Sequence, residues 1–142
     1  MPADASGRAD EPVIPHLLEV APDFAGQSFV RSAADVRLLR SRIPDEIGIV
    51  AKIERAEAID AINEIIEASE AIMIARGDLG VEIGDAKLPA AQKRLISLAR
   101  AGNKVVVTAT QMMESMIEHS IPTRELGFMV AKARIFRCAL TV

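Results

Sequence analysis

The chain lacks the features that mark disulfide-stabilised and zinc-binding proteins. It contains one cysteine in 142 residues, Cys138, and only two histidines. A single cysteine cannot form an internal disulfide, and no second cysteine or histidine cluster supplies the usual ligands of zinc. This cysteine usage fits the reducing environment of the cytoplasm.

Long apolar runs and a basic stripe are also missing. No stretch reaches the roughly 18 to 20 uninterrupted apolar residues of a membrane-spanning helix, and the first 12 residues have no apolar centre like that of a secretory signal. The 17 Lys and Arg residues are interspersed with 20 Asp and Glu residues, for a net charge of -3. We therefore expect a cytoplasmic protein that binds neither membranes nor nucleic acid.

Half of the residues, 50%, are hydrophobic, which is enough to build the core of one soluble domain. Residues 1–13 are small, charged and proline-containing, and we expect a disordered N-terminal tail there. Residues 14–124 form the predicted domain. Residues 125–142 form a C-terminal tail.

The apolar pattern within 14–124 alternates between strand and helix periods. Strands are predicted at 24–30, 47–53, 71–75 and 104–109. Helices are predicted at 14–20, with Leu17 and Leu18 on the buried side, and at 33–42, 57–68 and 89–101, while 78–87 is predicted as a loop. Strands that alternate with helices indicate an α/β fold with a parallel sheet. About four βα units fit in this length, and either an open sheet or a barrel would satisfy the pattern. A barrel-type chain of this length would be about half of a TIM (β/α)8 barrel, because a complete barrel needs about 200 residues or more.

Charged residues gather at the ends of two predicted strands. Lys52 and Glu54 end one strand and share a face, because alternate side chains of a strand point the same way. Gly77 and Asp78 follow the next strand, where a missing side chain lets a ligand approach the backbone and a carboxylate offers a hard oxygen. Two interpretations stay open: a site for a divalent metal and a phosphoryl or enolate oxygen, or a salt bridge with Asp78 as a helix cap.

Six ordered motifs resemble the catalytic barrel of the pyruvate kinase family. They are Ser28-Phe29-Val30-Arg31, Lys52-Ile53-Glu54, Ile65-Ile66-Glu67-Ala68-Ser69, Ala75-Arg76-Gly77-Asp78-Leu79-Gly80-Val81-Glu82-Ile83, Ala91-Gln92-Lys93, and Ala109-Thr110-Gln111-Met112-Met113-Glu114-Ser115-Met116 with Pro122-Thr123-Arg124. The resemblance covers about residues 14–124 and would correspond to the fourth to seventh barrel strands. It implies phosphoryl transfer from phosphoenolpyruvate to ADP, giving pyruvate and ATP, with Mg2+ and usually K+.

The resemblance also implies roles for single residues. Lys52 matches the lysine that lies against the transferring phosphoryl group and the enolate oxygen. Glu54 and Asp78 match the carboxylates that hold Mg2+. The cradle of the substrate carboxylate matches the backbone of Ala75, Gly77 and Asp78 and the hydroxyl of Thr110. Mg2+ and a lysine together would stabilise charge on the leaving enolate.

Several parts of the family pattern have no counterpart in this sequence. We find no segments for the first three strands, which carry the K+ ligands, nor for the lid and the regulatory domain. After Arg124 the resemblance fades, and no Ser-x-Glu-Thr signature follows, so we expect a frameshift, a premature stop or a degenerated copy. We accordingly expect little activity of the chain alone. Open strand edges predict a homo-oligomer. The alternatives are a non-catalytic remnant that binds Mg2+ or an enolate, and a Mg2+-dependent lyase acting through a pyruvate enolate.

Overall fold

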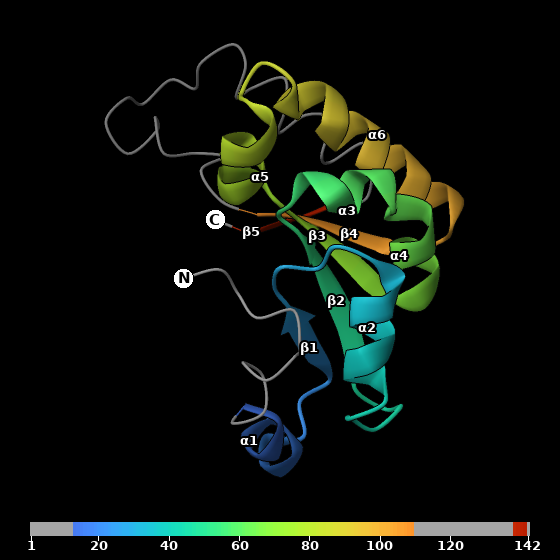
Figure 1. Ribbon diagram of the computed structural model, residues 1–142. Helices are drawn as coiled ribbons and strands as arrows, with labels where there is room; N and C mark the ends of the chain where they lie inside the picture. Colours follow the sequence, from blue (N-terminus) through green and yellow to red (C-terminus); the bar gives the residue numbers. More distant parts are fainter. Residues whose placement is uncertain (1–12, 110–137, 142) are drawn as a thin grey trace, which may run out of the picture.

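The fold is a sheet of five parallel strands with helices between them (Figure 1). The structure is a computed structural model and describes residues 13–109 and 138–141. The strands are β1 (Phe24–Gln27), β2 (Gly48–Ile53), β3 (Ala71–Ala75), β4 (Val105–Ala109) and β5 (Cys138–Thr141), and they neighbour one another in chain order. The helices are α1 (Val13–Val20), α2 (Ala33–Arg40), α3 (Ala56–Asp60), α4 (Ile62–Ala68), α5 (Arg76–Ile83) and α6 (Leu88–Ala101). The predicted α/β architecture with a parallel sheet is confirmed.

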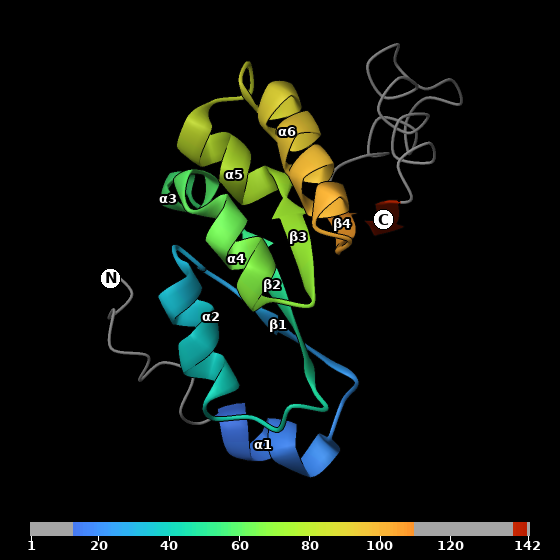
Figure 2. The ribbon, with the colours of Figure 1, turned by 90° about the vertical axis from the view of Figure 1, so that its right-hand side faces the viewer.

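One face of the sheet is covered by α2, α4 and α6, which pack side by side (Figure 2). The strand side chains that point toward these helices are fully buried, as Ile49, Ile53 and Ile72 show at 0% exposure. They meet the isoleucines and leucines of the helices in one apolar cluster. Burial of such branched side chains is the main stabilising term of the fold.

Among the described residues, fewer side chains cover the opposite face of the sheet. Lys52 is in register with Met73, and Met73 with Val107, so that these three side chains form a row on this face. All three are only partly buried. Lys52 therefore projects away from the helices while its neighbour Ile53 enters the core, as the strand alternation predicted.

The N-terminal ends of the strands are tied together by Arg40 at the end of α2. Its Nη1 donates hydrogen bonds to the carbonyls of Pro44 and Ile47, both at 2.9 Å, and its Nη2 donates to Glu70 Oε2 at 2.9 Å. The same Glu70 oxygen accepts the backbone N–H of Ile49 at 2.5 Å. One arginine thus joins α2 to the loops that enter β2 and β3, at the end of the sheet away from the candidate site.

Two sequence-based expectations about helices are wrong in detail. The helix expected at 57–68 is two helices, α3 and α4, because Ala61 leaves helical geometry at φ -90° and ψ 13°. The loop expected at 78–87 is helical up to Ile83, since burial of Leu79 outweighs the poor helix propensity of its glycines.

The first helix also differs from expectation. α1 begins at Val13 and has no fully buried residue, and Leu18 is 44% exposed although Leu17 packs against the core. Ile14 and Leu17 are its partly buried residues, and His16 and Glu19 pair on its exposed side, so the buried side includes Leu17 but not Leu18. None of the helices in the described part is both long and apolar enough to cross a membrane.

Candidate functional site

The residues of interest lie where β1, β2 and β3 end. In a parallel sheet all strands run the same way, so their carboxyl ends share one edge, and loops at that edge commonly carry functional groups. The register pairs Ile53 at the end of β2 with Ile74 near the end of β3. Glu54 and Ala75 each follow directly, and Asp78 comes three residues later. The sheet thus places Lys52, Glu54 and Asp78 at the same edge.

Lys52 and Glu54 form a close ion pair. The Lys52 Nζ lies 2.6 Å from Glu54 Oε1, and it also donates a hydrogen bond to the Ser28 hydroxyl at 2.8 Å. The Glu54 side chain is 3% exposed and that of Lys52 is 29% exposed. A nearly buried carboxylate needs such partners, since an unpaired buried charge is strongly unfavourable.

The second oxygen of Glu54 is held by the backbone of the loop after β1. Glu54 Oε2 accepts the N–H of Phe29 at 2.8 Å. Phe29 has a φ of 56°, in the left-handed region that a bulky residue seldom occupies, and its side chain is 60% exposed. This turn ends β1 at Gln27, so the strand predicted to reach residue 30 is shorter. Strained backbone of this kind often occurs at functional sites.

The N-terminus of α5 supplies the second half of the candidate site. Ala75 ends β3 and caps the helix, and Gly77 and Asp78 lie in its first turn. The first backbone N–H groups of a helix have no partner within it and favour anions. Asp78 is exposed, and within the described ranges its carboxylate makes no hydrogen bond or ion pair. It is therefore available to a ligand.

Arg76, at the start of α5, lies in a different environment. It is partly buried, and burial lowers its pKa below the usual value, while the nearby Asp85 carboxylate acts in the opposite direction. Asp85 lies over Gly80, where an added Cβ would meet its Oδ1 at 3.0 Å. These contacts fold the chain after α5 back against the helix.

The donor set fits a hard divalent cation such as Mg2+. No group of three or more His, Cys, Asp or Glu residues that could enclose a metal occurs in the part of the chain that the structure describes. Two carboxylates, Glu54 and Asp78, are the kind of small set with which proteins hold Mg2+, because this ion keeps several waters and takes further oxygens from a bound substrate. Each Glu54 oxygen has a second lone pair beyond its present partner, so its two contacts leave it able to bind a metal.

The structure brings some of the predicted site residues into contact and leaves others apart. Lys52 and Glu54 are in direct contact, and Ala75, Gly77 and Asp78 follow the neighbouring strand. Thr110 lies outside the described residues. Sequence reasoning gave no role to Ser28 and Phe29, although both stand in the first quoted motif. The position of that motif directly after a strand was the signal that could have assigned them to the site.

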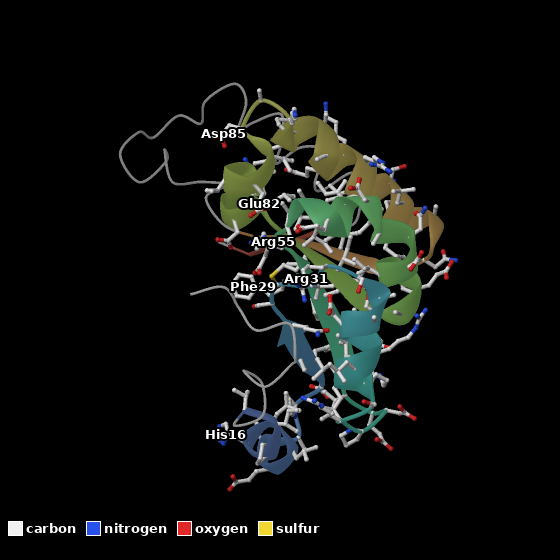
Figure 3. All side chains as sticks on the ribbon, viewed as in Figure 1. His16, Phe29, Arg31, Arg55, Glu82 and Asp85 are labelled. Carbon is white, nitrogen blue, oxygen red and sulfur yellow. The ribbon has the colours of Figure 1, made fainter. Side chains whose placement is uncertain are left out.

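A second ion pair at this edge was not predicted from the sequence, although Glu82 stands in the fourth quoted motif. Arg55 and Glu82 form an ion pair between the loop after β2 and α5, with Arg55 Nη1 3.2 Å from Glu82 Oε1 (Figure 3). The two residues are 27 positions apart, and nothing in their local sequence pairs them.

Taken together, a parallel α/β sheet with a lysine and two carboxylates at its carboxyl edge has the arrangement in which α/β domains, open or barrel-shaped, bind their ligands. Comparison with known proteins supports the family: the model "Pyruvate kinase, barrel domain" matches residues 3–136. This chain belongs to the pyruvate kinase family and contains part of its barrel domain. The resemblance inferred from the motifs is confirmed, and the matched range is wider than the motifs at both ends.

Individual relatives give the same result. The chain is 49% identical over 138 residues to a pyruvate kinase of Buchnera aphidicola subsp. Acyrthosiphon pisum, which covers 92% of this chain and 28% of that protein. It is 47% identical over 138 residues to pyruvate kinase of Haemophilus influenzae, with 92% of this chain and 29% of the relative covered. It is 44% identical over 134 residues to pyruvate kinase of Mycobacterium tuberculosis strain H37Rv, with 92% of this chain and 28% of the relative covered. The chain thus spans somewhat more than a quarter of the length of these relatives.

Proposed function

We propose that this chain carries the magnesium-binding and enolate-binding part of a pyruvate-kinase-type phosphotransferase site. The observation that supports this most directly is the Lys52–Glu54 pair at 2.6 Å, with Glu54 almost buried at the carboxyl edge of the sheet. A structural salt bridge needs no such position. A site that must neutralise phosphoryl and enolate oxygens needs a cation and metal-binding carboxylates together.

The substrates in this proposal are phosphoenolpyruvate and ADP. In the transfer, the bond between phosphorus and the enolate oxygen breaks while a terminal oxygen of ADP bonds to phosphorus, giving ATP. The enolate then takes up a proton to become pyruvate. Bound Mg2+ would supply positive charge to the phosphoryl and enolate oxygens. The family also uses K+, for which we assign no ligands in this chain.

Each residue has a defined part in the proposal. Glu54 and Asp78 hold Mg2+. Lys52 projects from the open face of the sheet and turns its ammonium group toward the bridging oxygen, with the Ser28 hydroxyl fixing the direction of Nζ. The N–H groups at Ala75, Gly77 and Asp78 receive the substrate carboxylate, with the Thr110 hydroxyl.

The chain alone is proposed to bind rather than to turn over. It spans about 28% of its relatives, and phosphoryl transfer depends on groups that close the site and exclude water. We therefore expect ligand binding with negligible ATP formation.

The test uses the isolated chain, Mg2+ and oxalate, a planar mimic of the pyruvate enolate. Amide NMR signals of Gly77 and Asp78 should shift only when both ligands are present, and the shifts should vanish in Lys52→Met. Lys93→Met, on the exposed side of α6, is the matched control and should behave as the wild type. Unchanged spectra in the wild-type chain, or equal binding by Lys52→Met, would contradict the proposal. Steady ATP formation that is lost in Lys52→Met would contradict the expected lack of turnover.

A further inference from the structure

Glu54 and Asp78 come from different elements, so something must fix their separation. Glu54 follows β2, whereas Asp78 lies in the first turn of α5, 24 positions later. Within the described residues the two carboxylates do not bond to each other, and a metal that uses both needs them held at a constant distance. The contacts between the loop after β2 and α5 are therefore of interest.

Glu82 is the side chain that makes these contacts. Its Oε1 lies 3.2 Å from Arg55 Nη1, and its Oε2 accepts a long hydrogen bond from the N–H of Ala56 at 3.5 Å. Arg55 directly follows Glu54 in the chain, and Ala56 begins α3. The two oxygens of one carboxylate thus attach α5 to the two residues that follow the first proposed metal ligand, one through the Arg55 side chain and one through the Ala56 backbone.

The position of Glu82 within α5 links it to the second ligand. Glu82 follows Asp78 by four residues, and side chains four apart lie on the same face of a helix. A rotation or shift of α5 that broke the contact with Arg55 would move Asp78 in the same direction. In Figure 3, Glu82 extends from α5 and Arg55 from the segment below it.

The pair is also more than an incidental surface contact. The side chains are 39% exposed for Arg55 and 28% exposed for Glu82, and Arg55 has a second carboxylate, Glu57 Oε2, at 3.7 Å from its Nε. That second contact stays within the loop and α3. Of the two Arg55 contacts, the one with Glu82 is the contact that joins the loop after β2 to α5.

We propose that Glu82, through Arg55, is a positioning residue that sets the separation of Glu54 and Asp78. This inference rests on the proposed function for the identity of the metal ligands. It gives Glu82 no direct contact with substrate or metal.

The experiment measures Mn2+ binding to the isolated chain by the relaxation of water protons, with Mn2+ replacing Mg2+ as the probe. Glu82→Gln should bind Mn2+ about tenfold more weakly, in the range found when residues that orient metal ligands are changed. Glu57→Gln is the matched control, because it removes the same charge from beside Arg55 without touching α5. It should change affinity less than about twofold.

Arg55→Met separates positioning from simple electrostatics. Removing a positive charge near a cation site strengthens metal binding if only Coulomb forces act. The positioning role predicts weaker binding instead, and predicts that Arg55→Met with Glu82→Gln is no worse than Glu82→Gln alone. Tighter binding by Arg55→Met, or equal losses in Glu82→Gln and Glu57→Gln, would overturn the inference.

A metal-free readout keeps the two proposals apart. Amide shifts of Gly77 and Asp78 in the absence of metal should change in Glu82→Gln and stay unchanged in Glu57→Gln. If the wild-type chain does not bind Mn2+, or if Asp78→Asn binds Mn2+ as well as the wild type does, the proposed function is wrong. The role of Glu82 toward a metal is then wrong with it. The metal-free shifts then decide whether Glu82 orients α5. If Mn2+ binds but neither readout responds to Glu82→Gln, only the positioning role is wrong.

Discussion

Replacing Lys52 by Met would leave the Glu54 carboxylate without its ammonium partner. Glu54 is 3% exposed, and Lys52 is the cation that contacts it among the described residues. Removing one partner of a fully buried ion pair costs about 3 to 5 kcal/mol. Lys52 is 29% exposed, and the Phe29 N–H still supports the carboxylate, so we expect a smaller loss of about 1 to 2 kcal/mol in the free energy of unfolding.

Removing the charge of the other partner, Glu54, should lower the free energy of unfolding by less. Glu54→Gln keeps an acceptor for Phe29, and the partly exposed Lys52 can regain water, so we expect a loss of about 0.5 to 1 kcal/mol. In the double variant neither charge is left unpaired. The sum of the two single losses in the free energy of unfolding should therefore exceed the loss in the double variant by about 1 kcal/mol.

Urea unfolding followed by circular dichroism measures all four proteins. The chain has no Trp or Tyr, so the helical signal replaces intrinsic tryptophan fluorescence as the readout. Single losses below about 0.3 kcal/mol, or losses that simply add, would refute the reasoning, since the ion pair would then be absent or fully solvated in solution.

Three further changes test other parts of the structure in the same unfolding assay. Leu79→Ala should lose about 2 to 4 kcal/mol because Leu79 is fully buried; a loss below 1 kcal/mol would mean that α5 does not pack as described. Phe29→Gly should stay within about 1 kcal/mol of the wild type, because relief of the positive φ offsets the flexibility of glycine, whereas Phe29→Pro should lose about 3 kcal/mol through its missing N–H and fixed negative φ. Equal effects of these two variants would count against the left-handed turn. Gly84→Ala should lose about 1 to 2 kcal/mol, since Gly84 has a φ of 84°; an unchanged midpoint would place this residue in ordinary backbone geometry.

The parts of the fold that sequence reasoning predicted are those decided by local periodicity. The run of β-branched residues before Lys52 and the isoleucines of α4 repeat with the periods of a buried strand and an amphipathic helix. β3 has the predicted bounds, Ala71–Ala75, and the strand alternation placed Lys52 on the face away from the helices. The motifs identified the family because six of them occur in order.

The parts that were missed depend on contacts between distant segments. The helix α5 contains two glycines, and its local propensity favours a loop. The helix is stabilised because Leu79 is buried in a core to which other elements contribute. The turn at Phe29 opposes the strand preference of an aromatic residue, and its N–H finds an acceptor 25 positions away in Glu54. A fifth strand at Cys138–Thr141 pairs with β4, which the local pattern of the tail did not indicate.

Two of these missed features, the turn at Phe29 and the helix α5, lie at the carboxyl edge of the sheet, and this gives them a common physical reason. A carboxylate that is 3% exposed and bound by a lysine, a strained backbone N–H and, in our proposal, a metal must be held by groups from several segments at once. The left-handed turn at Phe29 costs local conformational energy, and the glycines of α5 cost helix stability. Both bring backbone N–H groups to the edge where Glu54 and Asp78 lie, so two features that the local sequence did not predict help to build the proposed site.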